Sequence, residues 1–132
     1  MDKYWLEESG QYGVPFNPCI GIGKHQQVVE VQCQREYEGK GAHPNYIAKG
    51  VIDGFEEFKK SNIKKPYCLN QVKDNPLFKG VWTWSRGGGW GGPYIKNEFW
   101  IELNAYVISH WASNPLKTEK EILYDFVKAK GL

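Results

Sequence analysis

The chain has 132 residues, which suits a single domain, because domains usually contain about 100–200 residues. Its 17 basic and 15 acidic residues leave a net charge of only +2, which excludes a polyanion binder that works through bulk charge. Aromatic residues make up 15% of the chain, which argues against a disordered protein. The six Trp and eight Tyr residues suit either an aromatic core or a site that stacks on flat ligands or sugar rings.

The first half of the chain reads as a lead-in, a strand and a helix. Residues 1–25 carry frequent Gly and Pro and are expected to be irregular. Over 27–34, apolar and polar residues alternate, which predicts a strand whose polar side suits a lined cavity. A loop follows over 36–44. Apolar residues at helical spacing then predict one helix over about 45–60.

The second half continues with a strand and two helices, after a polar connection over 62–75. A strand is predicted over 78–84, followed by a glycine-rich stretch that cannot hold regular structure. An apolar stripe predicts a helix over about 97–113. A capping box, Thr118 to Glu121, opens a last helix that ends near 130.

This order predicts an α/β fold, with βα units and C-terminal helices over residues 26–132 forming one domain or a barrel fragment. Strands separated by helices favour parallel pairing through right-handed crossovers, so the two strands should be parallel and adjacent. Two strands alone cannot make a stable parallel sheet, because both of its faces need cover. The chain therefore resembles a piece of something larger or one half of an assembly.

The first candidate site follows the first predicted strand. Glu36 would lie near the carboxyl end of that strand, where barrel enzymes keep catalytic groups. Gln34, Arg35 and Tyr37 could hydrogen-bond or orient this carboxylate, and His43 lies downstream. The alternative is a surface glutamate that pairs with Arg35.

The second candidate site follows the second predicted strand, in the stretch 82–92. Trp84 and Trp90 could stack on sugar rings, and Arg86 could bind a carboxylate with its planar fork of donors. A phosphate-binding loop is excluded because no Gly-Lys-Ser/Thr follows the glycines. The alternative is a flexible loop with core tryptophans. We expect Glu36, His43, Arg86 and Trp90 to share one cleft at the carboxyl ends of the two strands.

The cysteines, the histidines and the N-terminal sequence add little to the prediction of function. Cys19, Cys33 and Cys68 form no C-x-x-C pair, so reduced thiols are expected rather than a disulfide framework. The three histidines lack metal-ligand spacing, so we expect no metal. No apolar run suits a transmembrane helix, and the N-terminus lacks the apolar region of a signal peptide, which leaves a cytoplasmic location as the default.

Both candidate sites resemble the family 67 glycoside hydrolases, the α-glucuronidases. Residues 29–39 with His43 are similar to the family's E-F-Q-I-T-Q-E-Y-L-G segment, and Glu36 falls on a catalytic glutamate of that segment. Further matches lie in 16–18, 80–81, 89–92, 104–106 and 112–115. The resemblance covers roughly Pro15 to Leu132.

The resemblance implies the C-terminal portion, the last two or three βα units, of a (β/α)₈ TIM-type barrel. It implies inverting hydrolysis of a glucuronosyl linkage in plant-type polysaccharide fragments, without a cofactor, in which Glu36 belongs to the base side. Glu8 is the carboxylate nearest to the family's second catalytic acidic residue. The family's general acid lies on an earlier strand that this chain lacks, so activity of the isolated chain is not expected.

Two other classes of function stay open. The chain could be a non-catalytic module that binds a uronic acid through Trp82, Trp84, Trp90 and Arg86. It could also be a subunit whose strand edges self-associate or dock onto another chain that carries the missing part of the barrel. Neither nucleic acid nor membrane is expected as a partner.

Overall fold

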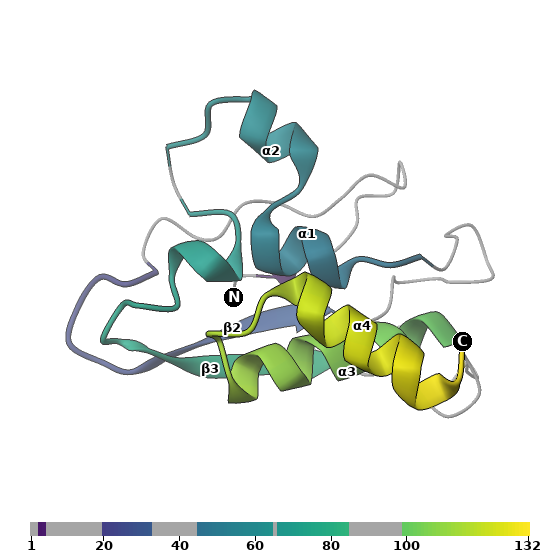
Figure 1. Ribbon diagram of the computed structural model, residues 1–132. Coiled ribbons are helices and arrows are strands. Elements are labelled where there is room, and N and C mark those ends of the chain that lie inside the picture. The colour runs from purple at the N-terminus through teal and green to yellow at the C-terminus, as the bar shows by residue number, and fades with distance from the viewer. Residues whose placement is uncertain (1–2, 5–19, 33–44, 65, 85–98) are drawn as a thin grey trace.

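The computed structural model of the protein describes residues 3–4, 20–32, 45–64, 66–84 and 99–132 (Figure 1). Three strands form one sheet in the order β1-β2-β3: β1 (Lys3–Tyr4), β2 (Gln27–Gln32) and β3 (Phe78–Trp84). Both pairs of neighbours are parallel. The predicted adjacent, parallel pairing of the two main strands is therefore confirmed, and β1 is an addition inside a stretch that was expected to be irregular.

The alternating pattern of β2 decides which face of the sheet enters the core. Val29 and Val31 are buried in the main hydrophobic cluster, so Val28 and Glu30 lie on the opposite face. On β3, Trp82 is the register partner of Glu30 and lies on that same opposite face. We call this surface, defined by Val28, Glu30 and Trp82, the open face.

A bulge in β3 sets this arrangement. Gln27 pairs with Phe78 whereas Val28 pairs with Gly80, so β3 contains one extra residue at this point. Gly80 has a φ of +148°, a backbone conformation that favours glycine. The bulge lets both Phe78 and Val81 pack on the core, and it thereby sends Trp82 to the open face.

Helices cover the core face of the sheet. They are α1 (Ala48–Asp53), α2 (Glu56–Lys60), the 3₁₀ turn η1 (Leu69–Gln71), α3 (Phe99–Ser113) and α4 (Glu119–Lys130). In Figure 1, α3 and α4 run side by side in front of β2 and β3, with α1 above them. Side chains of α1, α3 and α4 share one buried cluster with Val29 and Val31.

The single helix expected over about 45–60 is wrong, because the structure splits it into α1 and α2. Gly54 has a φ of +95°, and a Cβ there would overlap the ring of Tyr67. Phe55 then adopts an extended backbone, and its ring folds back against Gly50. The apolar spacing of this stretch thus reflects a turn that buries Phe55, rather than one continuous stripe.

The last helix forms as its end signals predict. The Thr118 hydroxyl accepts a hydrogen bond from the Glu121 amide, and the Glu121 carboxylate accepts one from the Thr118 amide. Gly131 ends the helix in the left-handed conformation. Ile122 and Phe126 are buried from α4, so the predicted apolar face enters the core.

The connection between α2 and β3 is less polar in the structure than its sequence suggests. Cys68, Leu69 and Val72 are buried around η1 and help to close the core below α1. Cys68 is a free thiol, and its burial raises its pKa above the ordinary value. Within the described part of the chain, no helix is long and apolar enough to cross a membrane.

Candidate functional site

The two main strands end at the same level of the sheet. β2 ends at Gln32 and β3 at Trp84, and these two residues are register partners. The chain therefore leaves both strands at one edge, toward the sequence stretches that begin at residues 33 and 85. In parallel α/β folds this carboxyl edge is where ligand-binding and catalytic residues gather.

Most of the predicted site residues lie outside the described residues. These are Glu8, Gln34, Glu36, Tyr37, His43, Arg86 and Trp90. For Trp84 the structure describes the backbone, which forms the last position of β3. The expected convergence of Glu36, His43, Arg86 and Trp90 in one cleft therefore stays a prediction.

The open face brings a carboxylate and an indole together just before the carboxyl edge. Neighbouring strands lie about 4.8 Å apart, so the register partners Glu30 and Trp82 have adjacent side chains on one face. Trp82 is 50% exposed and Val28 is 59% exposed, whereas Glu30 is only 9% exposed. The open face thus combines a nearly buried carboxylate with two accessible apolar side chains.

Asn104 holds the chain where it enters α1. Its side chain is 1% exposed, and its Oδ1 accepts hydrogen bonds from the amides of Ile47 at 2.9 Å and Ala48 at 3.0 Å. Its Nδ2 donates to the carbonyl of Asn45 at 2.9 Å. A side chain from α3 thereby satisfies donors that the start of α1 would otherwise leave unpaired. It fixes the point at which the chain returns from the stretch that contains Glu36 and His43.

A second tie joins the same point of the chain to α4. The hydroxyl of Tyr46 donates a hydrogen bond to the carboxylate of Glu119, which is buried in the first turn of α4. Burial raises the pKa of Tyr46 far above its usual range, and the hydrogen bond to Glu119 and the negative charge of Glu119 raise it further. The hydroxyl therefore keeps its proton and stays a donor.

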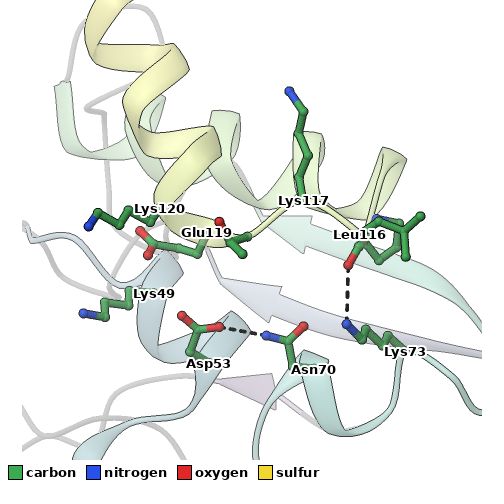
Figure 2. A pocket seen from close by; sticks show the side chains of 10 residues that line it. Lys49, Asp53, Asn70, Lys73, Leu116, Lys117, Glu119 and Lys120 are labelled. Atoms are coloured by element: carbon green, nitrogen blue, oxygen red, sulfur yellow. Dashed lines mark hydrogen bonds between the residues drawn. The ribbon is translucent and has the colours of Figure 1, made fainter.

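A hollow of about 350 Å³ lies among α1, η1 and the turn between α3 and α4 (Figure 2). Its charged lining residues are Lys49, Asp53, Lys73, Lys117, Glu119 and Lys120. None of its lining residues is among the predicted site residues.

Several polar and charged side chains that line this hollow are already paired with other groups of the protein. Asn70 donates to Asp53 at 2.7 Å, and Figure 2 shows this bond together with one from Lys73 to the carbonyl of Pro115. Lys117 pairs with Asp125 at 3.1 Å, and Tyr46 donates to Glu119. These contacts connect α1, η1 and α4, so they give the hollow a structural role.

The two histidines that the structure describes, His25 and His110, do not belong to a group of metal-ligating side chains. His110 is exposed on α3, stacks on the ring of Tyr106 at 3.7 Å between centroids, and its Nδ1 lies 2.8 Å from the Tyr106 carbonyl. His25 is exposed ahead of β2. Among the residues that the structure describes, no group of three His, Cys, Asp or Glu side chains could hold a metal ion.

Two residues of this region were not among the predicted site residues: Glu30 and Asn104. Trp82 was expected only in the non-catalytic alternative, as one of the tryptophans that bind a uronic acid. The strand pattern already placed Glu30 on the polar side of β2. Asn104 carried a signal too, since it is a polar residue between the apolar stripe positions Leu103 and Val107 of α3.

No family model matches the chain, and no significant match is found among the curated proteins or the solved structures.

Proposed function

We propose that the chain is a segment of a glycoside hydrolase similar to the family 67 α-glucuronidases. It would supply the last βα units of a (β/α)₈ barrel and act on glucuronosyl linkages of plant-type polysaccharide fragments. The observation that carries the proposal is the pairing of Gln32 with Trp84, because it ends both strands at one edge of a parallel sheet. Glu36 and Arg86 follow these strand ends in the sequence.

The proposed chemistry divides the work between a base and groups that bind the sugar. Glu36 acts on the base side and activates a water molecule that attacks the anomeric carbon, and Glu8 is the second carboxylate. Arg86 binds the carboxylate of the uronic acid through two parallel hydrogen bonds. Trp84 and Trp90 stack on sugar faces, while Gln34, Tyr37 and His43 bind hydroxyl groups or orient Glu36.

The shape of the sheet supports a barrel segment that needs further strands. The described helices pack on the face that carries Val29 and Val31. On the opposite face, at least half of the surface of Val28 and of Trp82 is exposed. β3 is an edge strand within the described sheet. In a closed barrel both features would be covered, the edge by the next strand and the open face by the barrel interior.

A second candidate function follows from the same observation. The chain would be a non-catalytic uronic acid binder, or a subunit that completes a barrel with another chain. The exposed open face favours the subunit, because the edge strand of the described sheet lies beside exposed apolar side chains, a combination typical of a docking surface. A substrate that needs no general acid separates the catalytic from the non-catalytic proposal.

The test uses α-glucuronosyl fluoride, because fluoride departs without protonation and the missing general acid is then not required. We expect the 132-residue chain to hydrolyse this compound with inversion, giving the β-anomer of glucuronic acid, as read by proton NMR. Glu36→Gln should lower the rate by about 100-fold or more, since an amide cannot act as the base.

The matched control is Glu57→Gln, which removes an exposed carboxylate on α2 and should leave the rate unchanged. Arg86→Ala should weaken the binding of glucuronic acid, measured by calorimetry, whereas Lys79→Ala on the exposed side of β3 should not. Retention of configuration, or full activity of the Glu36→Gln variant, would contradict the catalytic proposal. Binding without any hydrolysis would support the non-catalytic alternative.

A further inference from the structure

The hollow among α1, η1 and the turn between α3 and α4 is rich in lysine. Its lining includes Lys49, Lys73, Lys117 and Lys120. Lys117 pairs with Asp125, which lies outside the lining. The other three lysines form no ion pair with another residue that the structure describes. In Figure 2, Lys49 of α1 and Lys120 of α4 extend toward the same side of the hollow. Positive charges from different elements thus line one hollow.

The two carboxylates of the lining are Asp53 and Glu119, and neutral groups of the protein already bind both of them. Asn70 donates to Asp53 at 2.7 Å, and the Tyr46 hydroxyl donates to the buried Glu119. Neither carboxylate forms an ion pair with a lysine that the structure describes. The lysines of the lining therefore outnumber its carboxylates, and three of their charges stay available to an anion.

The type of cation and the size of the hollow indicate which anion would fit. Lysine binds as a compact point charge with three donors, which suits phosphate oxygens, whereas arginine is better matched to a planar carboxylate. Among the described residues that line the hollow, none is an arginine. Its volume of about 350 Å³ exceeds what one phosphate group needs and lies within the range of small-molecule sites, about 300–1,000 Å³. The hollow therefore suits a small organic molecule that carries a phosphate group.

We propose that this hollow binds the phosphate group of a small phosphomonoester, with Lys49 and Lys120 donating to the phosphate oxygens and Lys73 adding its charge. The start of α4 also favours an anion, because the positive end of the helix dipole lies there. The capping box already occupies the amides of Thr118 and Glu121, so the lysines carry the binding. The site shares no residue with the proposed hydrolytic site, so the two proposals stand or fall separately.

Calorimetry with glycerol 3-phosphate on the 132-residue chain tests the site. We expect this monoester to bind more tightly than inorganic phosphate, because the hollow also has room to contact the organic group. We also expect it to bind more tightly than succinate, a dianion whose charges lie on planar carboxylates. Equal affinity for inorganic phosphate or for succinate would overturn the assignment to a phosphomonoester.

Lys49→Gln and Lys120→Gln should each weaken the binding of glycerol 3-phosphate about tenfold, because each removes a charge-assisted hydrogen bond. Both side chains are exposed, so the core stays intact, and circular dichroism checks that each variant is folded. Lys128→Gln is the matched control, since it removes the same charge from an exposed position of α4 outside the lining. Unchanged affinity in both lining variants, or an equal loss in Lys128→Gln, would overturn the site.

Asp53→Asn gives a readout of the opposite sign. The amide oxygen of the new side chain can still accept the hydrogen bond from Asn70, while one negative charge leaves the lining. We expect the affinity for glycerol 3-phosphate to rise about threefold, because the phosphate is no longer repelled by this carboxylate. A fall in affinity would overturn the site, since it would show that the carboxylate contributes to binding the probe.

Discussion

Asn104 is a fully buried polar residue whose side chain makes three hydrogen bonds to the backbone at the start of α1. In Asn104→Ala, two amides and one carbonyl would lose this partner. Each unpaired buried group costs about 1–3 kcal/mol, so we expect the free energy of unfolding to fall by about 3 kcal/mol or more. Urea denaturation measures this loss.

Asn70→Ala is the matched control for this prediction. Asn70 is only partly buried and donates a hydrogen bond to Asp53 at 2.7 Å. We expect its removal to cost about 1 kcal/mol. If the two variants lose equal stability, then Asn104 does not hold the start of α1 as its contacts indicate.

Gly80 allows the bulge that sends Trp82 to the open face. Its φ of +148° is a conformation that side chains with a Cβ rarely adopt. We expect Gly80→Ala to reduce the free energy of unfolding by about 1–3 kcal/mol and to change the fluorescence of Trp82. Lys79→Ala, a neighbouring exposed position, should stay within about 0.5 kcal/mol of the original stability. Equal stability of Gly80→Ala would argue against the bulge.

At the scale of elements, α4 depends on its capping box. Thr118→Ala removes the hydroxyl that accepts from the Glu121 amide at 3.2 Å. We expect this change to cost about 1 kcal/mol in urea denaturation, which is typical for the loss of an N-cap side chain. Thr118 is exposed, so its removal leaves the core intact, and a cost near zero would show that the cap does not stabilise α4.

The same capping box predicts a dependence of stability on pH. Hydrogen bonds from the amide and hydroxyl of Thr118 lower the pKa of Glu121 below its ordinary value of 4.5. The folded state therefore favours the carboxylate, so its contribution is present above pH 4.5 and is lost as the pH falls through the lowered pKa. Thermal unfolding should show that Glu121→Gln is less sensitive to acid in this range, and an unchanged acid sensitivity would contradict the assignment.

At the scale of the whole molecule, the open face predicts association. Val28 and Trp82 expose apolar surface beside an edge strand of the described sheet. Burying a few hundred Å² of such surface contributes several kcal/mol, at about 25 cal/mol per Å². We expect the sedimentation coefficient of the isolated chain to rise with concentration, and Val28→Lys to suppress this rise.

Leu116→Lys is the matched control for association. Leu116 is also an exposed apolar residue, but it lies in the turn between α3 and α4, on the helical side of the fold. We expect it to leave the sedimentation behaviour unchanged. A chain that stays monomeric at every concentration would contradict the prediction that the open face drives association.

The sequence by itself determined the local elements and their order. Alternation along β2, the apolar stripe of α3 and the end signals of α4 are local properties, and the structure has these elements where the patterns place them. Parallel pairing of β2 and β3 followed from the helix between them, because a crossover of that length connects parallel strands. The proposed site residues remain predictions from sequence, since most of them lie outside the described residues.

The tertiary structure decided the features that depend on distant parts of the chain. The split at Gly54 follows from the ring of Tyr67 and the burial of Phe55, neither of which helical periodicity reports. The bulge depends on how β3 pairs with β2, so the position of Trp82 beside Glu30 is a property of the sheet rather than of either strand. The role of Asn104 arises in the same way, because its partners lie on α1 and are distant in sequence.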